Sequence, residues 1–407
     1  HQNEILEINE INNLDTMMVS VRITELNVRT NAITYFEDSD PIYEMSPFYP
    51  DSLFAYVSVM DQNFHPVRGI GSRTGWMSGD QQTDAGESVR SVWYPIYEFP
   101  EGAAEPYPSV YTTGVAPFVT QIAEQDQWPV TATFVVPASS AGVISAIKDS
   151  LCSMVEKFNE AKDQVSVVSY SNHVEKVLEL TDNFEDACSA LRESNSTSPA
   201  VLMDAIFRGI AESAQRSGRR AVVVLTEGNN TSFINRDQVI DYSMRMAVPI
   251  IVLNYGTPDQ AELKTLAEIS GGYYEELSSA ETDLFEKLFE LLTNYYLVAY
   301  KSPNQTMDGT IRNFDVTINY PKDPFPVGTD TLGRYLAPVD NNDLWLDVAS
   351  FPSGLAVEKH WKTTNPEETY DYVVSVLNTG NDRLNNITIE NMNSQYVTIT
   401  EQSTGDD

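Results

Sequence analysis

An alternation of strand-like and helix-like segments runs through the middle of the chain and limits its architecture more than any other feature. An apolar run at 131–137 is followed by a stretch at 142–158 in which apolar residues recur at the spacing of one helix face. Strand-like segments follow at 164–170 and 174–180, and strands and helices then alternate. This order predicts a doubly wound, Rossmann-like α/β domain with a parallel sheet.

The segments on either side of this domain show the period-two alternation of half-buried β-strands. Apolar residues alternate from Leu53 to Val59 before the domain and from Phe314 to Tyr320 after it. Neither flank is long enough to make a sandwich of its own. We therefore expect the two flanks to build one β-sandwich into which the α/β domain is inserted.

The predicted organisation has four segments. They are an N-terminal β-sandwich region with long loops at 1–127, the α/β domain at 128–302, a β segment that completes the sandwich at 303–338, and a short or incomplete C-terminal β domain at 339–407.

Five segments of the α/β region occur in the order of a known family. They read TFVVPASSAG at 133–142, LMDAI at 202–206, SGRRAVVVLTEG at 217–228, VPIIVLNYG at 248–256 and LAEISGGYY at 266–274. Together they resemble the von Willebrand factor A (VWA) domain of bacterial surface and secreted proteins. The stretch from Tyr370 to Asn391 similarly resembles the Ig-like repeats of bacterial surface proteins, so the C-terminal domain is expected to be Ig-like.

The resemblance also implies a metal site, which this chain is predicted to lack. Typical VWA domains hold Mg²⁺ or Mn²⁺ with an Asp-x-Ser-x-Ser turn, a Thr from a second loop and an Asp from a third. The corresponding residues here are Pro137, Ser139, Ala141, Ala200 and Glu227. Mg²⁺ needs oxygen ligands at about 2.0–2.1 Å in octahedral geometry, and three of these five side chains have no oxygen. We expect no metal and no other cofactor there; Ser139 and Glu227 are then helix caps or loop ligands of backbone amides.

Two other acidic segments leave alternatives open. The loop at 35–51 interleaves aromatic residues with carboxylates and prolines, which suits a protein, sugar or Ca²⁺ contact, or a loop whose rings pack on the sandwich. Its candidate contact residues are Tyr35, Phe36, Tyr43, Phe48 and Tyr49. The run from Asp340 to Asp343 offers hard oxygens for a structural Ca²⁺ ion, or forms a solvated linker.

Charge and hydropathy exclude several classes of partner. The chain has 25 basic and 59 acidic residues, which gives a formal net charge of -34. Such a field repels nucleic acid and anionic lipid, so neither is expected as a partner. No apolar run reaches the roughly 18 residues that a membrane-spanning helix requires, so direct membrane insertion is not expected. We expect an exported protein, extracellular or at the cell surface, whose signal peptide has been removed.

The two cysteines fit this location. Cys152 lies beside the apolar stripe of the predicted helix at 142–158, and Cys188 shares an apolar face with its neighbours on a later short helix. We predict that they form a disulfide, because two cysteines in an exported protein usually pair; two separately buried thiols are the alternative. Five Asn-x-Ser/Thr sequons are candidate glycosylation sites, at Asn195, Asn229, Asn230, Asn304 and Asn386.

Catalysis is not expected. No two of the four histidines, His1, His65, His173 and His360, stand at metal-ligand spacing, and no Gly-x-Ser-x-Gly motif surrounds Ser139. The sequence favours a non-catalytic, adhesion-type protein that binds other proteins through a metal-independent VWA scaffold. The alternative is a structural subunit of an extracellular filament, sheath or surface array, in which copies of the chain contact each other through terminal β-strands and domains.

Overall fold

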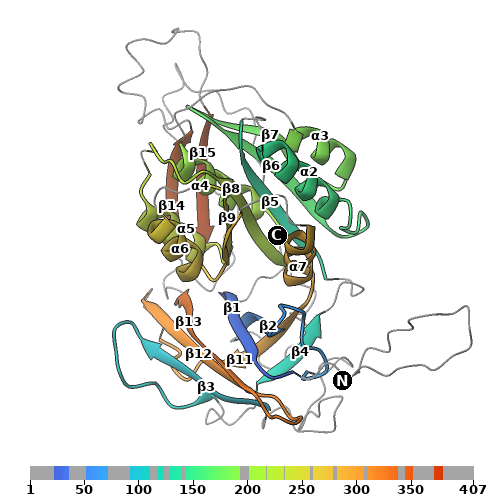
Figure 1. Cartoon of the computed structure of the whole chain (residues 1–407). Coiled ribbons are helices and arrows are strands. Elements are labelled where there is room, and N and C mark those ends of the chain that lie inside the picture. Colours follow the sequence, from blue (N-terminus) through green and yellow to red (C-terminus); the bar gives the residue numbers. More distant parts are fainter. Residues whose placement is uncertain are drawn as a thin grey trace, which may run out of the picture.

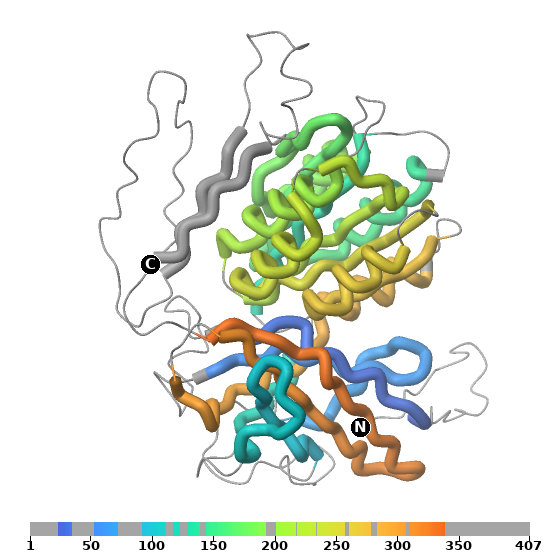
Figure 2. The backbone as a smooth tube through the Cα atoms, turned by 90° about the vertical axis from the view of Figure 1, so that its left-hand side faces the viewer, coloured from blue at the N-terminus to red at the C-terminus, as the bar shows by residue number. Residues whose placement is uncertain are grey.

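The computed structural model shows an α/β body and a β-sandwich body, one above the other (Figures 1 and 2). The residues that it describes are 23–35, 52–71, 92–110, 117–122, 128–138, 143–192, 201–216, 218–232, 234–256, 260–277, 282–306, 310–337, 344–351 and 371–378. None of the helices in these ranges is long and apolar enough to cross a membrane.

The α/β body has a six-stranded sheet with helices on both faces (Figure 1). Its strand order is β10-β9-β8-β5-β6-β7, and β7 alone runs antiparallel to its neighbour. The strands are β5 (Val130–Pro137), β6 (Gln164–Tyr170), β7 (Val174–Thr181), β8 (Arg219–Thr226), β9 (Ile250–Asn254) and β10 (Tyr274–Glu276). The helices are α2 (Val143–Val155), α3 (Phe184–Arg192), α4 (Leu202–Ser213), α5 (Arg236–Arg245), α6 (Gln260–Ile269) and α7 (Thr282–Thr293).

Two apolar layers hold the helices against the sheet. Side chains of α2, α3 and α7 pack on one face around Phe134 and Val223. Those of α4, α5 and α6 pack on the other face around Val135 and Val222. Every residue of β5 and β8 is buried, because a central parallel strand is covered on both sides. The doubly wound architecture expected from the sequence is therefore present.

The sandwich is built from strands on both sides of the α/β body in sequence. One sheet has the order β1-β2-β11-β4, and the other has the order β13-β12-β3. The strands are β1 (Leu26–Tyr35), β2 (Ser52–Asp61), β3 (Trp93–Pro100), β4 (Phe118–Ile122), β11 (Tyr295–Lys301), β12 (Ile311–Asn319) and β13 (Val327–Leu336). Buried and partly exposed residues alternate strictly along β12, and its buried apolar residues join Trp93, Ile96 and Tyr300 in the core.

The structure differs from the expected domain boundary at residue 302. Residues 295–301 lie in the range assigned to the α/β domain, yet they form β11 between β2 and β4 of the sandwich. A short run of apolar residues fits a buried strand of either body, and only its pairing with residues far away in sequence decides between them. The α/β body thus ends with α7.

At the C-terminus, β14 (Leu344–Phe351) pairs antiparallel with β15 (Asp371–Asn378). The other residues of the segment 339–407 lie outside the described ranges.

Polar and aromatic contacts join the two bodies. The Asn31 side chain accepts a hydrogen bond from Ser58 in the sandwich and donates one of 2.9 Å to the carbonyl oxygen of Gly271 in the α/β body. The buried Arg219 guanidinium lies 5.1 Å from the ring centroid of Tyr295 and 5.9 Å from that of Tyr56. These are cation–π contacts across the junction.

Candidate functional site

The candidate site is the edge of the α/β sheet formed by the carboxyl ends of β5, β8 and β9, called the crown below. The chain order reverses at β5, because β6 lies on one side of it and β8 on the other. In doubly wound sheets, ligands bind outside the carboxyl ends of the strands at this switch point. The described residues at the crown include Pro137, Thr226, Glu227 and Tyr255.

Pro137 ends β5, and a buried lysine holds that end in place. Lys148, on α2, is 1 % exposed, and its ammonium donates a hydrogen bond of 2.8 Å to the carbonyl oxygen of Pro137. Burial disfavours its charged form and lowers the pKa of the Lys148 amine to about 8. The Lys148 side chain therefore places an amine at the carboxyl end of β5, next to the crown.

The carboxyl end of β8 provides one exposed carboxylate. The hydroxyl of Thr226, which is buried, accepts a hydrogen bond of 2.9 Å from the Gly228 backbone amide. Glu227, the next residue along, is exposed and accepts one of 3.2 Å from the Tyr255 hydroxyl. Burial raises the pKa of the Tyr255 hydroxyl, and the neighbouring Tyr170 and Glu227 raise this pKa further. The tyrosine is thus a hydrogen-bond donor to Glu227.

The loop after β8 caps helix α4. Val201 precedes the first turn of α4 and has no side-chain oxygen, so it cannot cap the helix itself. The Ser232 hydroxyl instead accepts hydrogen bonds from the amides of Met203 and Asp204, at 2.8 and 3.2 Å. Asp204 returns the contact through a carboxylate oxygen that accepts from the Ile234 amide at 3.1 Å. Ser232 and Asp204 thus stabilise the start of α4 and the loop after β8.

The side-chain oxygens in the described part of the crown already have protein partners. Pro137 offers no side-chain oxygen. The Thr226 hydroxyl accepts a hydrogen bond from an amide, and the Glu227 carboxylate accepts one from a tyrosine hydroxyl. An octahedral Mg²⁺ shell needs several such oxygens converging on one point. The other predicted positions, Ser139, Ala141 and Ala200, lie outside the described residues.

The structure joins Cys152 and Cys188 by a disulfide between α2 and α3, with their Cα atoms 5.0 Å apart. Among the sequons, Asn229 is exposed at the crown, whereas the Asn230 side chain accepts from the Ser232 amide at 3.1 Å. The Asn304 side chain likewise accepts from a backbone amide, that of Thr306. Asn195 and Asn386 lie outside the described residues.

Most other candidates do not meet at a site. Of the loop at 35–51, only the backbone of Tyr35 is described, at the end of β1, and the run from Asp340 to Asp343 is not described. His173 is exposed in the turn after β6, where its ring contacts Asn172 and Glu175. His65 is separated from it, in a turn after β2.

Sequence reasoning missed Lys148, Tyr255 and Ser232. A lysine on an amphipathic helix is ordinarily exposed, and nothing in its spacing indicates that it reaches back to a strand end. Ser232 caps a helix that begins thirty residues earlier, so the local cap patterns do not reveal it. Tyr255 directly follows β9, and this position after a strand is the sequence feature that could have indicated a residue at the crown.

Residues 134–290 match the model of the von Willebrand factor type A domain. The α/β body is therefore a VWA domain, as the sequence segments predicted. No curated protein sequence matches the chain.

Several solved structures are similar to part of the chain. The conserved hypothetical protein BatB from Bacteroides thetaiotaomicron is 14% identical with a TM-score of 0.35, and the match covers 40% of this chain and 96% of that one. The vWF domain of the type V pili tip protein Mfa5 from Porphyromonas gingivalis is 9% identical with a TM-score of 0.32, over 40% and 94% of the two chains. Proximal thread matrix protein 1 from the mussel byssus is 18% identical with a TM-score of 0.37, over 45% and 51%.

Proposed function

We propose that the chain is a non-catalytic, extracellular or cell-surface protein that binds other proteins through the crown of its VWA domain without a metal ion. VWA domains are in general protein-interaction modules. The observation that supports binding without a metal is that the side-chain oxygens of Thr226 and Glu227 both accept hydrogen bonds from other protein groups. Recognition then rests on shape and on surface groups such as Glu227 and Tyr255.

The disulfide between α2 and α3 supports an exported location. Disulfides persist in oxidising compartments and are rare in the cytosol of most cells. The net charge of -34 suits a solvated surface in a saline medium, which screens the repulsion.

Metal titration tests the first part of the proposal. Calorimetry of the oxidised wild-type chain with Mg²⁺ and Mn²⁺ should give no binding heat. The combined variant Pro137→Asp, Ala141→Ser, Ala200→Thr and Glu227→Asp restores the oxygen ligands of the family and should gain a single site. Binding of Mg²⁺ by the wild-type chain would overturn the proposal, and a combined variant that binds nothing would show that the loops of the crown differ from the family as well.

Site-specific photo-crosslinking tests the docking surface. A photoreactive residue in place of Glu227 should capture a surface protein of the source cells, and the yield should not change in the presence of a chelator. The same residue in place of Glu179, exposed on β7, is the control and should capture little. Capture at Glu227 that requires Mg²⁺, or equal capture at both positions, would contradict the proposal.

Light scattering after size exclusion separates this function from the structural alternative. An interaction protein should elute as a small species with or without Mg²⁺ and Ca²⁺. Large assemblies that form without divalent ions would instead favour the filament or array subunit, whose copies bind each other.

A further inference from the structure

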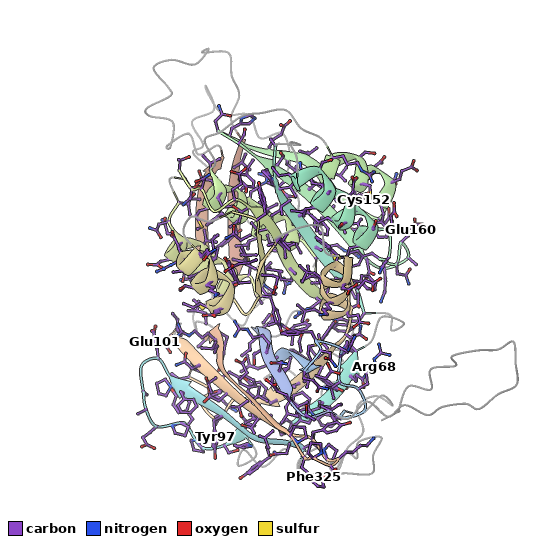
Figure 3. All side chains as sticks on the ribbon, in the orientation of Figure 1. Arg68, Tyr97, Glu101, Cys152, Glu160 and Phe325 are labelled. Atoms are coloured by element: carbon purple, nitrogen blue, oxygen red, sulfur yellow. A yellow bond between two sulfur atoms is a disulfide. The ribbon has the colours of Figure 1, made fainter. Side chains whose placement is uncertain are left out.

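Three side chains that could ligate a metal ion lie together where α2 and α3 meet, apart from the crown. Cys152 is on α2 and Cys188 on α3, two helices that lie side by side (Figure 1), and Figure 3 labels Cys152 on that side of the body. Glu156 follows Cys152 by one helical turn at the end of α2, so both side chains project from the same face of that helix. The ligand atoms of these three residues all lie within 4.8 Å of one another.

The distances suit a tetrahedral ion once the sulfurs are no longer bonded to each other. A Glu156 carboxylate oxygen is 3.9 Å from each sulfur atom. Zinc takes sulfur at about 2.3 Å and carboxylate oxygen at about 2.0–2.2 Å, which separates neighbouring ligand atoms in a tetrahedron by about 3.5–3.8 Å. The oxygen already stands at nearly this separation, so only the two sulfurs have to part. Cα atoms 5.0 Å apart allow this by rotation of the side chains.

The burial of the three residues leaves one side of this site open. Cys152 and Cys188 are 1 % and 3 % exposed, whereas Glu156 is exposed at the surface. An ion can therefore enter from the carboxylate side, and a water molecule from solvent can complete the shell. Thiolate ligands select thiophilic ions such as Zn²⁺ over Mg²⁺ and Ca²⁺.

We propose that the reduced chain binds one thiophilic divalent ion, Zn²⁺ or a chemical equivalent, through Cys152, Cys188 and Glu156. The disulfide and the metal ion are then alternative crosslinks between the same two helices. The proposal is independent of docking at the crown, which concerns the oxidised chain and a different edge of the domain.

The two states interconvert by balanced chemistry. Two equivalents of a thiol reductant give two electrons and two protons to the disulfide, which yields two cysteine thiols and the oxidised reductant. The ion then displaces both thiol protons and binds two thiolates. In the reverse direction, a disulfide oxidant such as oxidised glutathione takes two electrons from the two thiolates. Its own sulfur–sulfur bond breaks and two protons from water give two molecules of reduced glutathione, while the Cys152–Cys188 bond forms and the ion is released.

Cobalt titration of the full chain tests the site. The chain is reduced with a thiol, freed of reductant without oxygen, and titrated with Co²⁺, whose bonds to thiolates give a charge-transfer band in the near ultraviolet. We expect this band to saturate at one ion per reduced chain, to disappear on adding Zn²⁺, and to be absent from the oxidised chain. A reduced chain without the band would overturn the proposal.

Variants assign the ligands. Glu156→Gln leaves both cysteines in place and should weaken cobalt binding while the band persists; Cys188→Ser should abolish saturation at one ion per chain. Glu160→Gln, which changes an exposed glutamate in the turn after α2 (labelled in Figure 3), is the matched control and should bind as the wild type does. Equal affinity of Glu156→Gln and Glu160→Gln would remove Glu156 from the site and overturn the three-ligand proposal.

A stability readout guards against a folding defect in the cysteine variant. Zn²⁺ should raise the melting temperature of the reduced wild-type chain, because an ion that binds only the folded state stabilises it. It should leave that of the oxidised chain unchanged, and an equal rise in both states would place the ion elsewhere. The Mg²⁺ titration of the oxidised chain is unaffected by either result, so this proposal and the proposed function fail separately.

Discussion

Among single residues, Lys148 is a buried charged group at the carboxyl end of β5. Its buried ammonium donates a hydrogen bond to a carbonyl oxygen, and burial makes the charged form costly. The residue holds the carboxyl end of β5 in place, at a cost in stability that depends on pH.

The pH dependence gives a testable consequence of the lowered pKa. Between about pH 8 and pH 10.5 the folded chain loses this proton while the unfolded chain keeps it, so the free energy of unfolding due to Lys148 rises with pH. Below pH 8 both states are protonated and the cost of burial is fully present. We expect the stability difference between the wild type and Lys148→Met to shift by roughly 3 kcal/mol in favour of the wild type over this window. Urea unfolding at several pH values measures it.

The control for this measurement is Lys157→Met, which removes an exposed lysine paired with Glu286 at 3.0 Å. It corrects for the loss of one positive charge from a strongly acidic chain. A difference between the wild type and Lys148→Met that is flat with pH would refute the assigned cost of burial.

At Gly271 the backbones of the two bodies approach each other closely. The φ of Gly271 is +79°, and a Cβ added there would lie 2.3 Å from the carbonyl oxygen of Asn31. Gly102 has a similar φ of +69° but nothing within 4 Å of its added Cβ. Gly271→Ala should therefore lose more stability than Gly102→Ala, whose loss reflects only the backbone cost of roughly 1–2 kcal/mol. Chemical denaturation compares the two variants, and equal losses would mean that the junction can open to admit a methyl group.

Among the structural elements, α4 depends on a residue outside its own sequence. The Ser232 hydroxyl bonds the amides of Met203 and Asp204, which have no partner within the helix. Ser232→Ala should cost about 1 kcal/mol of stability, as the loss of a helix cap does. It should also speed hydrogen exchange at these two amides.

The matched control is Ser153→Ala, which removes a hydroxyl that bonds a carbonyl oxygen of its own helix, at Asp149. This change should have little effect on either measurement. Unchanged exchange at Met203 and Asp204 in Ser232→Ala would show that the hydroxyl is dispensable and that another group caps α4.

The sequence predicted the elements of the α/β body closely, because their periodicity is local. The strand expected at 164–170 is β6 without any change of boundary, and the helix expected at 142–158 is the shorter α2. The sequence-based prediction placed β11 in the α/β domain, because an apolar run alone does not indicate which sheet a strand joins. At the crown, the resemblance to the family singled out Glu227, but the Tyr255 donor depends on how two strands lie side by side. Such contacts are fixed by tertiary packing and leave no periodic signal.

At the scale of the whole molecule, the insertion couples the two bodies. The sandwich takes β1 to β4 from before the VWA domain and β11 to β13 from after it. The folded domain holds the chain ends at β4 and β11 close to their places in one sheet, where they pair directly. If the domain unfolded alone, the sandwich would have to close a flexible loop of residues 123–294, at an entropic cost of roughly 4–5 kcal/mol.

We therefore expect the VWA domain and the sandwich to unfold in one transition. Hydrogen exchange measured along a urea series should show peptides of β8 and β12 losing protection at the same midpoint. Arg219→Met removes the cation that lies over Tyr56 and Tyr295 and puts an apolar side chain in its place, so it should lower this common midpoint. Arg192→Met, which breaks an exposed ion pair with Asp149, should lower it much less. Two separate midpoints in the wild-type chain would mean that the junction is too weak to couple the bodies, and that the crown is carried on an independently folding domain.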